Sequence, residues 1–254
     1  MGKAVKAEMT KETIQKIGRI AKDREVILDA DAIDKFARYL ELLQEWNERM
    51  NLTAITSEDD VITRHFLDSL APLFAIKDRR TPLYDKGASL IDIGTGAGFP
   101  GIPLAIVLPE LKITLADSLH KRIGFLETVK SELQLDAVTI VEGRAEELAR
   151  SDSLRECFDI AVARAVAELS TLSEYALPFV RVGGTFMAYK GSKAPEEAAN
   201  AESALALLGG SASELIPYTL SDCDDALYLV CVKKKAATPE KYPRRTGIPS
   251  KRPL

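Results

Sequence analysis

A cluster of glycines directly after a short apolar segment is the feature that most constrains the fold of this chain. Residues 90–93 read Leu-Ile-Asp-Ile, and a glycine-rich run from Gly94 to Gly101 follows at once. A strand that ends in glycines lets backbone N–H groups and the start of the next helix approach a bound nucleoside closely. The pattern predicts an open α/β sheet with a ligand at the carboxyl ends of its strands.

The residues around this cluster alternate between short apolar strands and helices. We expect strands at residues 90–93, 113–117, 138–141, 158–163 and 185–189, the last after a turn at Gly183-Gly184. The expected helices run from Pro100 or Pro103 to Leu108, from a cap at Ser118 to Leu133, and over residues 195–208. Continuous apolar strands separated by helices indicate a doubly wound, mostly parallel sheet that is covered on both faces.

Two apolar runs near the C-terminus have no helix between them. Residues 214–220 and 227–232 are joined by an acidic turn at 221–225 and predict an antiparallel edge hairpin, which brings the sheet to seven strands. We expect residues 81–232 to form this sheet domain. Residues 233–254 hold four prolines and too few apolar side chains for a core, so they are expected to form a basic C-terminal tail.

Residues 1–80 are expected to form an N-terminal helical extension. Apolar side chains recur at three- and four-residue steps over residues 33–50, which predicts an amphipathic helix that Asp31 opens. Ser57 resembles a helix cap and predicts that a second helix begins there.

Composition excludes several classes of protein. The apolar runs are well short of the ~18 residues that span a bilayer, and the N-terminus lacks an apolar signal core, so we expect a cytoplasmic protein without a membrane anchor. Three cysteines without a CxxC pair and two isolated histidines predict no metal site. The net charge of -4 argues against a protein that coats nucleic acid, yet residues 233–254 carry +7 and the rest of the chain -11. This basic segment is expected to lie along an RNA backbone, with a solvated tail as the alternative.

An acidic residue at the end of the second strand narrows the choice of ligand. Asp117 stands where a carboxylate reaches the ribose hydroxyls of an adenosine. Gly96 to Gly101 formally match the G-x-G-x-x-G pattern of dinucleotide sites, but Phe99 and the proline after it crowd the place of a pyrophosphate. S-adenosylmethionine needs no diphosphate cradle, and Asp92 supplies a carboxylate for its ammonium group. A glycine turn without a ligand is the third alternative.

Several motifs extend over the chain from about Asp31 to its end. They are NLT from Asn51, RHFLDSL from Arg64, DIGTGAGFPGIPLAI from Asp92, DSLHKR from Asp117, ARAVAEL from Ala163, YKG from Tyr189 and YPRRTGIPSKRPL from Tyr242. Together they resemble the family of ribosomal RNA small-subunit methyltransferase G, also called glucose-inhibited division protein B. The resemblance implies a class I S-adenosylmethionine-dependent methyltransferase fold. It also implies methyl transfer from S-adenosyl-L-methionine to N7 of one guanine in 16S ribosomal RNA, with the RNA or the small ribosomal subunit as partner; a monomer is expected.

The turn and the resemblance together give a set of candidate site residues. The expected cofactor-binding residues are Asp92, Gly94, Thr95, Gly96, Gly98, Phe99, Asp117, Ser118, Ala145, Glu146 and Arg164. Asp117 would hold the ribose, Ala145 and Glu146 would frame the adenine edge, and Phe99 would pack near the methionine arm. The candidates for positioning the acceptor base are Arg164, Lys190, Arg144, His65 and Asn51. None of them is expected to act as a general base.

The expected acceptor explains why a base is not needed. Guanine N7 carries a lone pair and no proton, so catalysis reduces to positioning and electrostatics. The chain lacks both the Asn/Asp-Pro-Pro-aromatic run of exocyclic-amine methyltransferases and a cysteine after a proline, and Arg164-Ala165-Val166 follows the fourth strand instead. The target is expected to be a loop or an opened base, because A-form RNA buries N7 in a narrow groove. The alternatives are a methyltransferase for another RNA, a small molecule or a protein, and a non-catalytic RNA-binding ribosome assembly factor.

Overall fold

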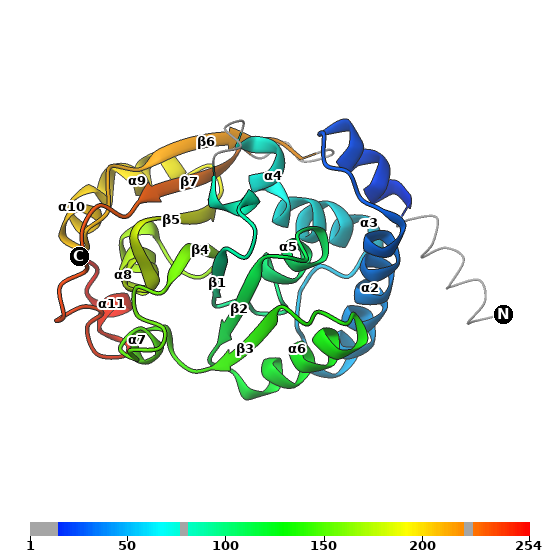
Figure 1. Cartoon of the computed structure of the whole chain (residues 1–254), viewed down its shortest axis with the longest axis horizontal. Coiled ribbons are helices and arrows are strands. Elements are labelled where there is room, and N and C mark those ends of the chain that lie inside the picture. The colour runs from blue at the N-terminus through cyan, green and yellow to red at the C-terminus, as the bar shows by residue number, and fades with distance from the viewer. Residues whose placement is uncertain (1–14, 77–80, 221–225) are drawn as a thin grey trace.

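A seven-stranded β-sheet forms the centre of the molecule (Figure 1). The computed structural model describes residues 15–76, 81–220 and 226–254. Its strands are β1 (Ser89–Ile93), β2 (Lys112–Asp117), β3 (Val138–Glu142), β4 (Phe158–Arg164), β5 (Val180–Lys190), β6 (Glu214–Tyr218) and β7 (Leu227–Lys233). They lie in the order β3-β2-β1-β4-β5-β7-β6, in which β1 to β5 are parallel and β7 is antiparallel to both β5 and β6. The predicted doubly wound sheet with an antiparallel edge hairpin is therefore confirmed.

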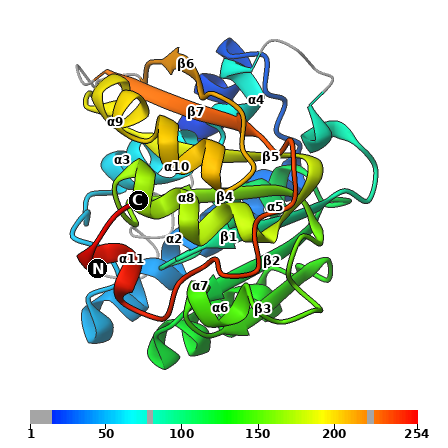
Figure 2. The same ribbon diagram turned by 90° about the vertical axis from the view of Figure 1, so that its left-hand side faces the viewer.

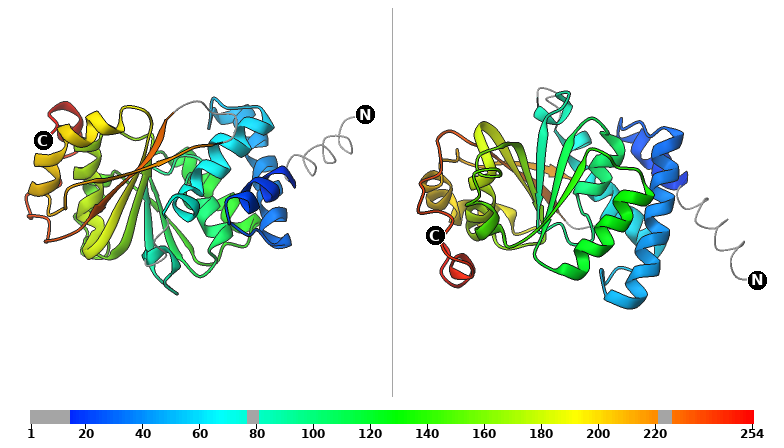
Figure 3. Two further views of the ribbon diagram at one scale, coloured as in Figure 1. Left: turned by 90° about the horizontal axis from the view of Figure 1, so that it is seen from above. Right: turned by 60° about the horizontal axis from the view of Figure 1, so that its bottom comes forward.

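Helices cover the two faces of this sheet in separate groups, as Figures 2 and 3 show from three further sides. The α-helices are α2 (Ala30–Met50), α3 (Glu58–Val61), α4 (Ala71–Ala75), α5 (Gly101–Val107), α6 (His120–Glu132), α7 (Ala145–Leu148), α8 (Leu169–Ala176), α9 (Ala194–Asn200), α10 (Glu202–Leu207) and α11 (Ile248–Lys251). A π-helical turn spans Ile62–Leu67, and 3-10 turns span Pro82–Tyr84 and Leu177–Phe179. In the described part of the chain, no helix is long and apolar enough to cross a membrane.

The apolar core has two halves, one on each face of the sheet. Neighbouring residues of a strand point to opposite faces. Leu90 of β1 accordingly packs in one half with Phe36 and Phe66 of the N-terminal helices, and Ile91 packs in the other half with Leu172 of α8. The N-terminal helices thus share a continuous core with the sheet, while the division of the chain after residues 80 and 232 stays a prediction.

Local hydrogen bonds set where the N-terminal helices begin and end. Asp29, rather than the predicted Asp31, caps α2, because its side chain accepts from the backbone N–H of Ala32 at 2.8 Å. Asp31 lies in the first turn, where a negative charge also favours a helix. The predicted cap at Ser57 is confirmed, since its hydroxyl accepts from the N–H of Asp60 at 3.2 Å.

Three predictions in the sheet domain need correction. Ser118 does not cap α6: the helix begins at His120, its N-cap position is Leu119, and no side chain caps it. The N–H of Leu119 donates instead to the side chain of Asp117 at 2.9 Å. The Gly183-Gly184 pair lies inside β5 rather than before it. The single helix expected over residues 195–208 is two short helices, α9 and α10, and the acidic turn at 221–225 lies outside the described residues.

The basic C-terminal segment is attached to the sheet domain by polar contacts. The ammonium group of Lys234 is buried, donates to the carbonyl of Leu177 at 2.6 Å and lies 3.0 Å from a carboxylate oxygen of Glu156. The guanidinium of Arg155 donates to the carbonyls of residues 238 and 242 at 2.8 and 2.9 Å. The segment has few apolar residues, as its composition indicates, but ion pairs and carbonyl contacts hold it where a core would otherwise be needed.

Candidate active site

The glycine turn after β1 is organised around a buried carboxylate. Oδ2 of Asp92 accepts from the Thr95 hydroxyl at 2.6 Å and from the backbone N–H of Gly101 at 2.8 Å, so it connects the two ends of the turn. Burial raises the pKa of Asp92 to about 6. Oδ1 is also buried and has no hydrogen-bond partner among the described residues. The buried Asp92 side chain therefore holds the glycine turn in its conformation.

Gly94 occupies a position where a side chain would not fit. Its φ is +67°, a left-handed conformation that glycine adopts without strain. A Cβ atom at this position would lie 2.9 Å from Cγ2 of Val166. The turn also contacts the N-terminal helices, since the Tyr39 hydroxyl on α2 donates to the carbonyl of Ala97.

Asp117, at the end of β2, faces the same turn. Its Oδ2 accepts from the N–H of Gly96 at 2.9 Å and from Arg122 at 3.1 Å, and its Oδ1 accepts from the N–H of Leu119 at 2.9 Å. The carboxylate is nearly buried, and these three bonds fix its orientation. Each oxygen has acceptor capacity beyond a single bond, so the group can still receive a donor from a ligand.

A cavity of about 530 Å³, here the central cavity, opens at the carboxyl ends of β1, β2, β3 and β4. Its lining residues are Ile93, Gly94, Ala116, Asp117, Ser118, Leu119, Arg122, Gly143, Arg144, Ala145, Glu146, Ala165, Val166, Tyr175, Thr246, Gly247 and Ser250. Six predicted site residues line it, namely Gly94, Asp117, Ser118, Arg144, Ala145 and Glu146. The predicted residues Asp92, Thr95, Gly96, Gly98 and Phe99 belong to the turn but are not among its lining residues.

The end of β4 borders a second, smaller cavity. This side cavity has a volume of about 280 Å³ and is lined by Asp68, Arg164, Ala165, Tyr189, Lys190, Gly191, Tyr218 and Leu227. Ala165 lines both cavities and has a φ of 56°, which is unusual for a residue other than glycine. Arg164 lines the side cavity whereas Val166 lines the central cavity. The two cavities therefore share a lining residue directly after β4.

Arg164 is held in a fixed position by groups of the N-terminal helices. Its Nη1 donates to Oδ2 of Asp68 at 2.8 Å and to the carbonyl of Arg64 at 3.0 Å. The other oxygen of Asp68 accepts from the Tyr218 hydroxyl at 2.7 Å. The guanidinium also lies 5.0 Å above the ring of Phe99, a distance suited to a cation–π contact.

His65 connects this arginine to the loop after α2. Its Nδ1 lies 3.2 Å from Nη2 of Arg164, its Nε2 lies 2.8 Å from the Thr53 hydroxyl, and its ring stacks on Phe99 at 4.5 Å. Burial, together with the charge of Arg164, lowers the pKa of His65 to about 4. The imidazole is therefore neutral near pH 7. Its Nδ1 lies 3.2 Å from both Nη2 of Arg164 and the carbonyl oxygen of Arg64, and it accepts from Arg164 in the tautomer whose Nε2–H donates to Thr53.

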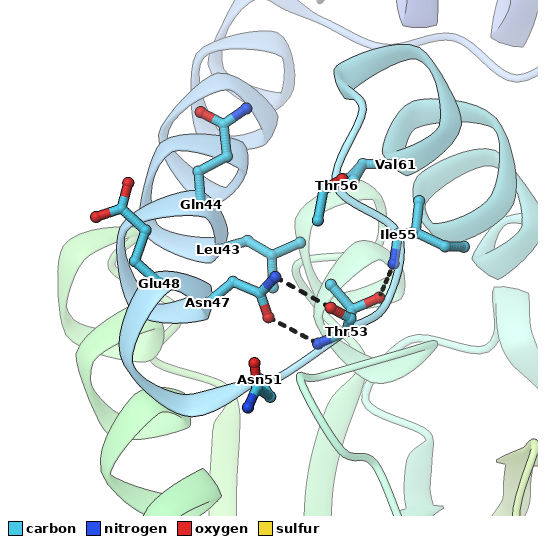
Figure 4. Close-up of a pocket in the computed structure, with 9 residues that line it drawn as sticks. All are labelled: Leu43, Gln44, Asn47, Glu48, Asn51, Thr53, Ile55, Thr56 and Val61. Carbon is cyan, nitrogen blue, oxygen red and sulfur yellow. Dashed lines mark hydrogen bonds between the residues drawn. The ribbon is translucent and has the colours of Figure 1, made fainter.

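Two other predicted positioning residues, Lys190 and Asn51, make different contacts. The ammonium of Lys190 donates to the carbonyl of Ala167 and to Glu197, both at 2.6 Å, so it is engaged in a partly buried ion pair. Asn51 lines a third cavity of about 520 Å³ with Leu43, Gln44, Asn47, Glu48, Thr53, Ile55, Thr56 and Val61. Figure 4 shows this cavity, in which the Asn47 amide makes two hydrogen bonds with the backbone of Thr53 at 2.9 and 3.0 Å.

Several residues at these cavities were not predicted from the sequence. Asp68 lies within the quoted RHFLDSL motif, and its position three residues after His65 was the available signal. Tyr218 had no such signal, because it contacts Asp68 across 150 residues of chain. Thr246 and Gly247 lie in the segment that was expected to be a tail.

Comparisons with known proteins identify the family of this chain. The family GidB, described as rRNA small subunit methyltransferase G, matches residues 32–220. Two relatives are named ribosomal RNA small subunit methyltransferase G. The protein from Acetivibrio thermocellus is 48% identical over 229 residues, which cover 90% of this chain and 91% of that protein. The protein from Desulfitobacterium hafniense is 44% identical over 247 residues, which cover 97% of this chain and 100% of that protein.

One solved structure has a fold similar to that of this chain. The crystal structure of a putative S-adenosyl-L-methionine-dependent methyltransferase from Methanococcus maripaludis superposes with a TM-score of 0.50 at 17% identity, covering 81% of this chain and 95% of that one. The strand order and this likeness confirm the class I methyltransferase fold. On the sequence matches, the chain belongs to the GidB family of rRNA small subunit methyltransferases G.

Proposed function

We propose that this chain transfers a methyl group from S-adenosyl-L-methionine to N7 of a guanine in 16S ribosomal RNA. The observation that carries the proposal is the central cavity, which Gly94 and Asp117 line at the carboxyl ends of the strands. Ligands bind at this edge in open α/β sheets. The substrate is the small ribosomal subunit or its RNA, which implies a cytoplasmic reaction, and we propose that the enzyme acts as a monomer.

The chemistry of the central cavity fits this cofactor. Asp117 and Glu146 are carboxylates with little exposure, and they suit the hydroxyl and amino donors of an adenosine better than the negative charge of a diphosphate. Asp117 would accept from the ribose hydroxyls and Glu146 from the adenine amino group. The buried Oδ1 of Asp92 is a further acceptor without a partner among the described residues, next to the turn that would face the methionine part.

The acceptor base would lie on the other side of Ala165, in the side cavity. S-adenosyl-L-methionine supplies an electrophilic sulfonium methyl group when it is bound. Guanine N7 needs no deprotonation, so the task of the protein is to orient the base with N7 in line with the methyl group. A guanidinium has five N–H donors, and the described groups take three of those of Arg164. The two that are left can donate to guanine O6, which leaves N7 free to accept the methyl group.

Labelled cofactor and small ribosomal subunits from cells that lack the gene provide the test. The expected result is one labelled 7-methylguanine per subunit, with no label in subunits from unmodified cells because their site is already methylated. Label that is absent from guanine N7, or that appears on another atom, would overturn the proposed reaction. Calorimetry with S-adenosylhomocysteine tests the cofactor independently of the RNA.

A further inference from the structure

The C-terminal segment 244–251 lies against the same cavity that the glycine turn forms. Thr246, Gly247 and Ser250 line the central cavity together with Gly94 and Asp117. Figures 1 and 2 show the C-terminal end of the chain with α11 beside α7 and α8, at one side of the sheet. Parts of the chain that are about 150 residues apart in sequence thus share one cavity.

A buried ion pair holds this segment in place. Nε and Nη2 of Arg244 donate to the carboxylate of Glu174 on α8 at 2.9 and 2.6 Å, and the backbone N–H of Arg244 donates to it at 2.7 Å. The side chain of Glu174 is fully buried. A buried carboxylate is stable only when it is paired and hydrogen-bonded, so the position of Arg244 is strongly determined.

A second set of contacts joins the segment to the start of α7. The N–H of Gly247 donates to Oε1 of Glu146 at 2.9 Å, and the Thr246 hydroxyl donates to Glu147 at 3.0 Å. Gly247 has a φ of +78°, so this backbone geometry favours glycine. One oxygen of Glu146 is therefore engaged by the segment, and the other is available to a ligand in the central cavity.

We infer that Thr246, Gly247 and Ser250, the residues of this segment that line the central cavity, are part of the cofactor site. They form the outer wall of the central cavity and orient Glu146, with the Arg244–Glu174 ion pair as their anchor. This inference rests on the proposed function, because it takes the central cavity as the cofactor site. Docking of the segment and binding of the cofactor are therefore linked. A change that displaces the segment lowers the affinity for the cofactor, and the bound cofactor in turn restrains the segment.

Two neighbouring substitutions in the full chain test the wall. Ser250 lines the central cavity and Lys251 does not, and both are exposed. Ser250→Trp is expected to weaken S-adenosylhomocysteine binding at least about tenfold by calorimetry, because the ring occupies the cavity. Lys251→Trp adds the same ring beside it and is expected to leave the affinity within about twofold. Equal affinities of the two variants would overturn the inference.

Amide hydrogen exchange on the unmodified chain gives a second test that needs no substitution. Saturation with S-adenosylhomocysteine is expected to slow exchange in residues 244–251, and unchanged exchange there would overturn the inference. Failure of the unmodified chain to bind S-adenosylhomocysteine would overturn the proposed function and the inference with it. Binding that Ser250→Trp leaves intact would overturn the inference alone.

Discussion

Asp92→Asn removes a buried charge while keeping the acceptor that shapes the glycine turn. The carbonyl oxygen of asparagine can replace Oδ2, which accepts from Thr95 and Gly101. The amide nitrogen then replaces Oδ1, which has no partner within the described ranges. Burial raises the pKa of Asp92 from 3.8 to about 6, so between these pH values the folded protein holds the proton more tightly than the unfolded chain does. Its stabilising contribution is complete below pH 3.8 and is lost as the pH rises through 6.

The size of the effect follows from the two pKa values. Between pH 5 and pH 8, ionisation of Asp92 alone lowers the free energy of unfolding by roughly 1 kcal/mol. Asparagine does not titrate, and the other groups titrate similarly in both proteins. The stability of Asp92→Asn relative to the unmodified chain is therefore expected to increase by roughly 1 kcal/mol over this range. Urea unfolding at four pH values between 5 and 8 measures this difference.

Asp159 offers a control of opposite sign. Burial acts to raise its pKa, but hydrogen bonds from Ser89 and Arg181 outweigh burial and hold the pKa below its usual value. Its contribution is present above its ordinary pKa and is lost only at lower pH, so the cost of Asp159→Asn is expected to be constant from pH 5 to pH 8. A stability difference for Asp92→Asn that is equally constant would refute the assignment of a raised pKa to Asp92.

Three further substitutions test other parts of the site. Asp117→Ala is expected to weaken S-adenosylhomocysteine about 100-fold by calorimetry with an unchanged circular dichroism spectrum; unchanged affinity would contradict its contact with the ribose. Arg244→Ala removes the ion-pair partner of the buried Glu174 carboxylate and is expected to lower the free energy of unfolding by about 3 kcal/mol or more in urea. The control Arg245→Gln changes an exposed neighbour and is expected to lower it by less than about 0.5 kcal/mol. Similar losses in the two variants would argue against the anchor. Arg245→Gln combined with Arg252→Gln is expected to reduce the salt slope of RNA binding by about 1.4, and an unchanged slope would exclude these two residues from the RNA contact.

The sheet and the turn could be predicted because their signals are local in sequence. The short β1 segment, the glycines after it and Asp117 at the end of β2 can each be recognised from their own stretch of sequence. The contacts of Arg164 could not be predicted in this way, because its partner Asp68 is 96 residues away on another layer. The same holds for Arg244, which is 70 residues from Glu174. Composition alone describes that segment as basic and poor in apolar residues, and cannot tell charges that are paired from charges that face solvent.

The end of β4 explains how the two proposed subsites stay aligned. Arg164, Ala165 and Val166 are consecutive, yet the first lines the side cavity, the last lines the central cavity and Ala165 lines both. The left-handed backbone at Ala165 redirects the chain at this junction. A side chain at position 94 would collide with Val166, so the glycine turn packs closely against the residues that follow β4. The position of the turn therefore depends on the position of this strand end. A shift of Ala165 would move the guanidinium and the wall of the cofactor site together. Methyl transfer without a general base depends on such alignment, because positioning is the main contribution that the protein makes.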